Sequence, residues 1–300
     1  MGTYKYLIIY FCIFSIFFSI LEAIVNPFIL SVGSVFVVVM NLSKTIITNR
    51  SICQVLVNMI CGCFGVVISL IAVHFIFRYF AIQREGKLKY FRGKYMVIWF
   101  FIPIMCGIFW TSTTYYFLKP NDRVTLILKD HLKLVYDVDT ENIVYTGSDY
   151  FIDDLKYQFN FEIIPGMIIM ATIIIISLSI VALFWIKIYK AIKKLDQQGQ
   201  SDFTRKLQKQ LFYALVIQSC IPLFFMYLPV SLFLFLPVFN IQIDKMGHIV
   251  TLLYAIYPSI DPLPVILIID CYRLSLFNLF RKNNRVGELN DIPSGRDNTF

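Results

Sequence analysis

The sequence predicts an all-α integral membrane bundle of about six transmembrane helices, and three observations support this. Hydrophobic residues make up 58% of the 300 positions and charged residues 15%, whereas soluble domains contain about 45–50% and about 25%. Six apolar stretches are each long enough to cross a hydrocarbon core about 30 Å thick. The basic residues gather between these stretches. Too little polar material remains to cover the surface of a soluble enzyme.

The six stretches are separated by polar or charged segments. They cover residues 6–25, 52–77, 95–116, 163–186, 211–235 and 249–269. The first lacks a small-x-small cleavage site after its apolar run, so we expect a retained helix rather than a cleaved signal peptide. Residues 28–42 are apolar but short and contain Gly33, and we expect an interfacial loop there rather than a span.

The distribution of charge predicts the orientation, because Lys and Arg accumulate in cytoplasmic loops. Residues 78–94, 187–209 and 273–296 are strongly basic, whereas residues 117–162 carry nine acidic and five basic side chains. This predicts cytoplasmic termini and an outer acidic segment. The net charge of +8 then indicates topology and not nucleic-acid binding. Asn41 and Asn49 open two glycosylation sequons in a loop predicted to face outward.

Motifs for catalysis or metal binding are absent from the sequence. It has no Gly-rich phosphate loop, no H-E-x-x-H and no G-x-S-x-G. The three histidines are far apart, and Cys61 and Cys63 are too close together for metal-ligand spacing. We therefore expect no enzyme activity, no cofactor and no metal.

Polar residues within the spans are candidates for function, because each is costly in hydrocarbon. Asp261 lies about 20 Å into the last span by helical rise, among Pro258, Pro262 and Pro264. Gln218 precedes Pro222 by four residues, which predicts a kink in the fifth span.

The predicted cytoplasmic ends of two spans carry further features. His74 and Arg78 lie one helical turn apart at the end of the second span, where an arginine alone is an ordinary interfacial anchor. After the last span, residues 273–282 mix Leu and Phe with Arg and Lys, which predicts an amphipathic segment lying on membrane lipid. Cys271 beside it is a candidate for palmitoylation.

Three motifs occur in order along nearly the whole chain. Residues 2–11 read GTYKYLIIYF, residues 74–82 read HFIFRYFAI, and residues 257–264 read YPSIDPLP, followed by DCYR at 270–273. They resemble the second-, third- and seventh-helix motifs of nematode serpentine chemoreceptors, the Str class (serpentine receptor class-r) of seven-transmembrane G-protein-coupled receptors. HFIFRYFAI stands where other such receptors have a D-R-Y box, and Gln218 and Pro222 fit the sixth helix.

The resemblance implies an olfactory-type receptor that detects an odorant or other small chemical and activates a heterotrimeric G protein. Its expected location is the plasma membrane, in the cilia of chemosensory neurons. The six spans would correspond to helices 2–7 of the family, so the first helix would be missing. Residues 1–281 would form the receptor domain, and residues 282–300 would form the cytoplasmic tail. The resemblance also implies a disulfide between the third helix and the outer loop that follows. Cys53 is placed for this disulfide, but the loop, residues 117–162, contains no cysteine to pair with it.

The resemblance also assigns roles to residues. Arg78 would be the switch arginine, with Asp261 and Pro262 as the hinge of the last helix, and the full set for G-protein coupling and switching is His74, Arg78, Tyr79, Asp261, Pro262 and Tyr272. A ligand pocket is expected in the outer halves of the helices, as an apolar cavity with a few polar groups. Its candidates, each of which could instead serve helix packing, are Asn58, Met59, Met167, Met170, Phe224, Tyr227, Thr251 and Tyr254.

Two other interpretations remain open from the sequence. A six-helix transporter or channel subunit would place Asp261 in an ion or proton pathway and would explain both termini being inside. However, the two halves show no inverted repeat, and this class does not explain the ordered motifs. A decayed receptor copy would keep the membrane fold without binding a ligand.

Overall fold

The long apolar runs form long helices because, in a bilayer, backbone polar groups must bond within a helix or a closed barrel. The structure is a computed structural model, and it contains five described helical segments that are long and apolar enough to cross a membrane. Four are single helices, and the fifth is α6 with its continuation. They are α1 (Tyr4–Val25), α2 (Arg50–Gln83), α3 (Lys94–Phe117), α5 (Ile164–Gln197) and α6 (Asp202–Pro222). The membrane bundle is thereby confirmed.

The structure describes most of the chain. The described residues are 4–47, 49–83, 90–91, 93–153, 158–197, 202–239, 246–260, 262–270, 272–275 and 277–278. Three expectations therefore fall outside them: the hinge role of Asp261, palmitoylation of Cys271 and the tail at 282–300.

Prolines interrupt the last two segments of the bundle. Directly after Pro222, where a kink was predicted, the helix becomes a π-helix over Leu223–Tyr227 before α7 (Leu228–Phe235) continues. The sixth predicted span consists of α8 (Gly247–Ile260) and α9 (Leu263–Ile268). The break between them falls at Pro262, which has no backbone N–H to donate.

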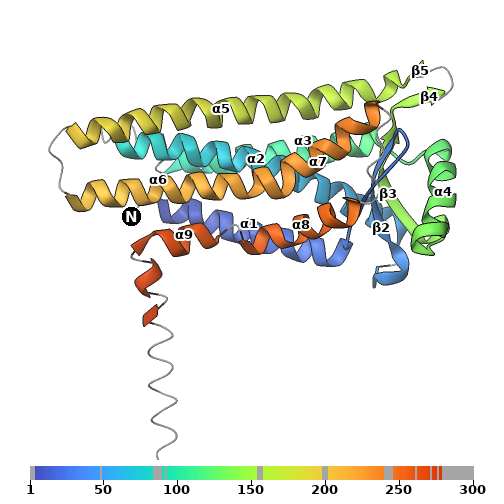
Figure 1. Cartoon of the computed structure of the whole chain (residues 1–300), viewed down its shortest axis with the longest axis horizontal. Coiled ribbons are helices and arrows are strands. Elements are labelled where there is room, and N and C mark those ends of the chain that lie inside the picture. Colours follow the sequence, from blue (N-terminus) through green and yellow to red (C-terminus); the bar gives the residue numbers. More distant parts are fainter. Residues whose placement is uncertain are drawn as a thin grey trace, which may run out of the picture.

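A three-stranded antiparallel sheet lies at one end of the bundle (Figure 1) and was not expected. Its strands are β1 (Phe28–Val32), β2 (Val35–Asn41) and β3 (Ile143–Asp149). The interfacial loop predicted at 28–42 is therefore wrong, because this segment is a β-hairpin that turns at Gly33 with a φ of 59°. The β-branched run in β2 suits a pleated strand that is buried on both faces.

The sheet separates two groups of buried side chains. On one face, Leu30, Val37 and Tyr145 pack with Val124 and Leu128 of the amphipathic helix α4 (Asp122–Tyr136). On the other face, strand residues join the main core of the bundle; these are Ile29, Phe36, Val38, Met40 and Val144. A two-stranded ribbon of β4 (Phe151–Asp153) and β5 (Gln158–Phe159) follows β3. The predicted outer segment is therefore a folded cap on the bundle.

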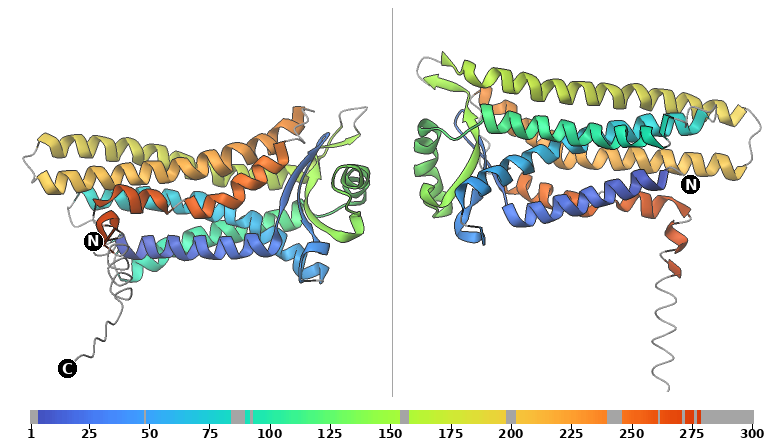
Figure 2. Two further views of the ribbon diagram at one scale, coloured as in Figure 1. Left: turned by 60° about the horizontal axis from the view of Figure 1, so that its bottom comes forward. Right: turned by 180° about the vertical axis from the view of Figure 1, so that it is seen from behind.

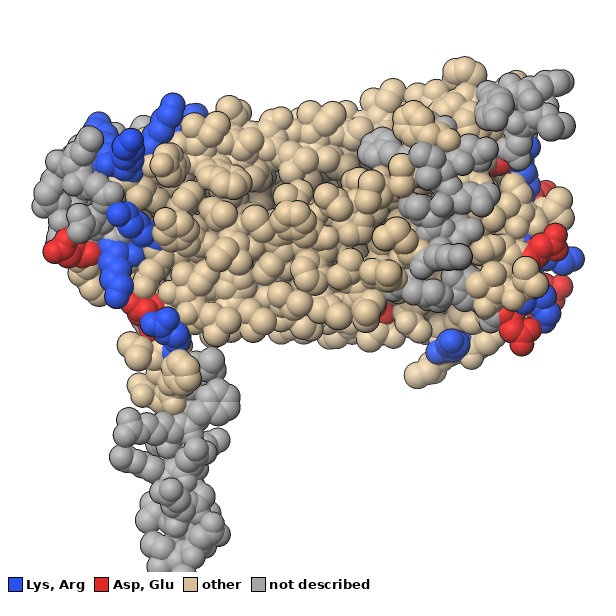
Figure 3. All heavy atoms as spheres, viewed as in Figure 1, with Lys and Arg blue, Asp and Glu red and all other residues tan. Residues whose placement is uncertain are grey.

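The two ends of the bundle differ in charge. Lys and Arg side chains gather at one end of the molecule (Figure 3). This is the end where α1 begins, α5 ends and α6 begins (Figures 1 and 2). We call this the basic end and the opposite one, with β1, β2, β3 and α4, the sheet end. The visible band between them is almost uncharged in its described residues (Figure 3). This is the arrangement expected from the positive-inside rule, with the acidic segment opposite the basic loops.

Candidate functional site

An apolar cavity of about 70 Å³ lies between the sheet and the helices. Ile29, Phe36 and Val38 from the hairpin form its roof, together with Thr146 of β3. The walls and floor come from α2, α3, α5, α7 and α8; the residues that line them include Ile60, Cys61, Phe64, Trp110, Thr114, Met170, Val230, Thr251 and Tyr254. The sheet thus covers the cavity on the side away from the basic end.

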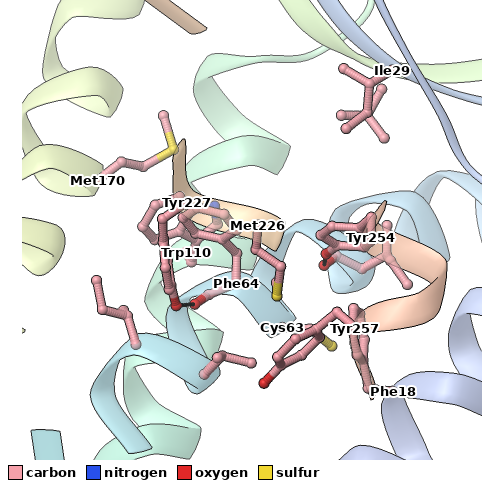
Figure 4. Close-up of a cluster of buried hydrophobic side chains, with 14 of the residues drawn as sticks. Phe18, Ile29, Cys63, Phe64, Trp110, Met170, Met226, Tyr227, Tyr254 and Tyr257 are labelled. Atoms are coloured by element: carbon pink, nitrogen blue, oxygen red, sulfur yellow. Dashed lines mark hydrogen bonds between the residues drawn. The ribbon is translucent and has the colours of Figure 1, made fainter. Parts of the chain in front are cut away.

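Phe64 and Trp110 line this cavity. Figure 4 shows that they belong to a cluster of buried aromatic side chains that includes Tyr227 and Tyr254. The Phe64 ring lies 4.4 Å from the Tyr227 ring and 5.2 Å from the Trp110 ring, measured between centroids. The Tyr227 hydroxyl donates to the Phe64 carbonyl at 3.0 Å, and the Tyr254 hydroxyl to the Ile60 carbonyl at 3.0 Å. These two bonds fix α8 and the π-helix against α2, so the floor is held by directional contacts as well as by packing.

Four of the residues that line the cavity carry a hydroxyl group, and each hydroxyl donates its hydrogen to a backbone carbonyl. Tyr254 bonds Ile60, as above; Thr146 bonds Leu118 at 3.0 Å, Thr114 bonds Thr111 at 2.9 Å, and Thr251 bonds Gly247 at 2.9 Å. Thr251 also accepts from the Ile29 N–H at 3.2 Å. Because their hydrogens are in use, these hydroxyls could only accept a hydrogen bond from a guest molecule.

The pocket candidates named from the sequence are dispersed. Met170, Thr251 and Tyr254 line the cavity, and Tyr227 lies beside its floor. Phe224 is 58% exposed on the outside of the bundle.

The other three candidates lie elsewhere. Met167 is half-buried and packs against the main core. Asn58 is buried and donates to the Gln54 carbonyl at 2.7 Å. Met59 lines a separate groove between α1, α2 and α3.

Sequence reasoning missed the cavity roof entirely. The sequence signal for the roof was the run of β-branched residues at 35–39, which is typical of a β-strand and not of an interfacial loop. The partner strand was hidden, because Val38 pairs with Thr146 more than a hundred positions away. Trp110 and Phe64 were also missed, since hydropathy does not reveal which side of a helix faces inward.

At the basic end, Arg78 joins α2 to α6. Its Nη2 donates to the Gln208 backbone carbonyl at 3.1 Å and to the Gln208 Oε1 at 2.5 Å. Arg78 is 4% exposed, so this contact is sheltered from solvent and lipid. Its neighbour Tyr79 packs instead against α5, with its ring 5.4 Å from that of Phe184. Two of the predicted switch residues therefore face different helices.

A second contact joins α6 to the segment that follows α9. Asp270 pairs with Lys206 at 3.0 Å and with Arg273 at 2.7 Å. Hydrogen bonds from Gln210 and Lys206 lower the pKa of the Asp270 carboxyl. Because this pKa is lowered, the stabilisation is present above the ordinary carboxyl range and is lost only in more acidic solution. Tyr272 packs near this contact, against the cluster formed by Leu211, Ala214, Val265 and Ile269.

The two sequon asparagines are in different environments. Asn41 is buried at the end of β2, and its side chain accepts from the Ser43 N–H at 2.9 Å. Asn49 is exposed and precedes α2, where it accepts from the N–H groups of Ser51 and Ile52 at 3.0 and 3.2 Å. Accessibility therefore favours Asn49 as the acceptor.

Comparison with known proteins decides between the receptor and transporter interpretations. The family described as serpentine type 7TM GPCR chemoreceptor Str matches residues 1–277. The chain belongs to this family. It is similar to serpentine receptor class r-10 of Caenorhabditis elegans, with 31% identity over 96% of this chain and 85% of that protein. Serpentine receptor class r-10 of Caenorhabditis briggsae is 30% identical over 96% and 84%.

A third relative extends the match within the family. The G-protein coupled receptor str-33 of Caenorhabditis elegans is 27% identical over 97% of this chain and 85% of that protein. The relatives are named as receptors and not as enzymes, transporters or channels. This serpentine receptor is therefore a multi-pass membrane protein of the chemoreceptor class.

Proposed function

We propose that this serpentine receptor binds a small chemical in the cavity under the sheet and activates a heterotrimeric G protein at the basic end. The observation that carries the proposal is the apolar cavity under the sheet, whose walls are helices that continue to the basic end. The positive-inside rule makes the basic end cytoplasmic, where a G protein is available. The receptor would then act in the plasma membrane, with sensory cilia as the location implied by the family.

The cavity restricts the ligand. Its volume of about 70 Å³ is well below the 300–1,000 Å³ typical of pockets for drug-sized molecules, so the ligand is small. The lining is almost entirely apolar, and the hydroxyl groups of its residues have no free hydrogen to donate. A ligand with an apolar body and one hydrogen-bond donor matches this lining. A ligand that has only acceptors would find no hydrogen-bond donor in the cavity. Short-chain alcohols have these properties.

The contact between Arg78 and Gln208 supports a switch at the basic end. In this arrangement the guanidinium is buried against α6, so a partner can reach it only after α6 moves away from α2. A ligand drives such a movement by binding the open arrangement more tightly. His74, Tyr79, Pro262 and Tyr272 lie along α2 and the last helix and are proposed to position these elements. Asp261, outside the described residues, is kept as the proposed hinge.

A cell reporter of G-protein activation tests the ligand site. Cells that express the chain are exposed to short-chain alcohols and to ketones of matched size, such as sec-butanol and butanone. We expect alcohols to be more potent than their ketones. Met170→Trp, which fills the cavity, should remove the response. Met167→Trp on the same helix is the control and should keep it, because Met167 does not line the cavity.

Two results would contradict the proposal. The first is an unchanged response in Met170→Trp at equal surface level. The second is no response to any member of the panel while the receptor is at the surface. Equal potency of alcohols and ketones would overturn the proposed ligand class but not the proposal that the ligand binds in this cavity.

A further inference from the structure

A second cavity, of about 50 Å³, lies deeper in the bundle between α1, α2, α6 and the last helix. Apolar side chains such as Ile8, Phe11 and Val265 form much of its wall. Two polar side chains also line it, His74 of α2 and Gln218 of α6, and Pro262 borders it at the break in the last helix. The ligand cavity shares none of these residues.

His74 is a buried polar group with an unused hydrogen-bonding atom. Its side chain is 3% exposed, and its Nε2 has no hydrogen-bond partner within the described part of the chain. Gln218 is 5% exposed and brings both a donor and an acceptor to the same cavity. A buried polar atom without a partner costs about 1–3 kcal/mol, so the folded protein gains if something polar fills the space.

Water fits this space by size and by chemistry. One water needs about 10–15 Å³ of such volume and two to four polar partners, so the cavity has room for more than one. His74 and Gln218 supply partners from two helices. The last helix can supply others, because Pro262 and Pro264 have no N–H to donate to the carbonyls four residues earlier.

The described residues argue against a metal ion in this place. No group of three His, Cys, Asp or Glu side chains lies close enough together among them to hold one. A phospholipid headgroup is excluded by size, since the cavity holds only a few water-sized molecules.

We propose that this cavity is an internal hydration site in which ordered water bridges His74 to Gln218 and joins α2, α6 and the last helix. Water-mediated bonds are nearly as favourable as direct ones, and they re-form when the groups that they join shift. The water would therefore keep the polar groups around the helix break hydrogen-bonded while the last helix moves. The hydration does not depend on the proposed receptor function.

Hydroxyl-radical footprinting by X-ray radiolysis tests the water directly, because bound water generates radicals next to buried side chains. The full chain is irradiated in lipid nanodiscs, and oxidation of Phe11 is compared with that of Phe18. Both are buried on α1, but Phe18 lines neither cavity. We expect several-fold faster oxidation of Phe11. Equal and slow oxidation of the two rings would overturn the proposal.

A double-mutant cycle tests the bridge. His74→Phe and Gln218→Leu should each lower the thermal midpoint, and the double variant should lose clearly less than the sum, because the first change already removes the shared water. His74→Phe combined with Gln54→Leu, at the sheet end of α2, is the additive control. If His74→Phe is not recovered folded, His74→Asn replaces it. Strict additivity of His74 and Gln218 would overturn the bridge.

Discussion

The sheet end and the basic end of this receptor are held together in different ways. At the sheet end, strands from distant parts of the chain pair through backbone hydrogen bonds and are bonded to the helix ends. Gln54 of α2 donates to the Tyr145 carbonyl at 3.0 Å, and the Gly147 N–H donates to the Leu118 carbonyl at 2.9 Å. The buried carboxylate of Asp149 is satisfied by Ser34 and by Arg123, the latter at 2.6 Å.

The basic end depends on side-chain contacts between helices. Arg78 with Gln208, and Asp270 with Lys206 and Gln210, are polar contacts that join α6 to its neighbours there. Lys206 is largely exposed, and exposed ion pairs contribute about 0–1 kcal/mol. α6 can therefore separate from α2 at far lower cost than the sheet can open. The difference supports the proposal that the sheet end is a rigid end around the ligand cavity and that the basic end is a releasable end that signals.

The largest effect is expected from a side chain at Gly147 in β3. A Cβ there would lie 2.1 Å from the Phe36 carbonyl oxygen and 2.6 Å from the Val37 Cα, and the φ is 156°. Gly147→Val should therefore open the sheet and destabilise the protein by more than about 3 kcal/mol. Thermal unfolding of purified receptor measures this.

The matched control for this change is Gly33→Asn. Gly33 has positive φ, but no atom lies within 4 Å of its Cβ position, and Asn tolerates this conformation. It should unfold within a few degrees of the unmodified chain. Similar midpoints for the two variants would show that the sheet end is not the rigid part.

A smaller effect with a clear direction is expected at the basic end. Gln208→Ala removes the side-chain acceptor of Arg78, which is worth about 1.5–3 kcal/mol for a charged hydrogen bond. Signalling without ligand should rise by roughly tenfold or more. Tyr213→Phe, on the exposed side of the same helix, is the control. A fall in basal signalling at equal surface level would contradict the switch.

Two tyrosines allow the effect of the cavity on the response to be distinguished from the effect of helix packing. Tyr254 and Tyr227 both donate to α2 carbonyls at 3.0 Å, but only Tyr254 lines the cavity. Each Tyr→Phe change should cost about 1 kcal/mol of stability. Only Tyr254→Phe should also weaken the response to alcohols, by up to about tenfold. Equal shifts in dose–response for both variants would place the ligand elsewhere.

The smallest effect is expected at the pair of Lys206 and Asp270. Lys206→Met should change basal signalling by less than about twofold, because the pair is exposed and screened. Since the pKa of Asp270 is lowered, basal signalling should also be flat across the neutral pH range. A change in basal signalling as large as that of Gln208→Ala would contradict the expectation that the Lys206–Asp270 pair restrains α6 less than the Arg78–Gln208 contact does.

The sequence predicted the parts of this structure that a bilayer imposes. Span length and basic loops gave the helices and their ends, and Pro222 gave the interruption before the π-helix. It did not predict the sheet, because pairing of β2 with β3 joins segments about a hundred residues apart. α4 was accessible in principle, since Val124, Leu128 and Leu132 recur every four residues.

Partners across helices were not predictable in the same way. Arg78 was expected at the basic end, but its acceptor Gln208 depends on how α6 rotates against α2. That rotation is set by packing between whole helix faces and not by local sequence. The same reason explains why Met170 lines the cavity while Phe224 faces outward.

The division of labour between the two ends is tested most directly by Arg78→Ala. Binding of the most potent alcohol to purified receptor and activation of the G protein are measured on the same preparation. We predict that activation is abolished while the dissociation constant changes by less than about tenfold, or about 1.4 kcal/mol. Loss of binding in a variant that remains folded would contradict the account.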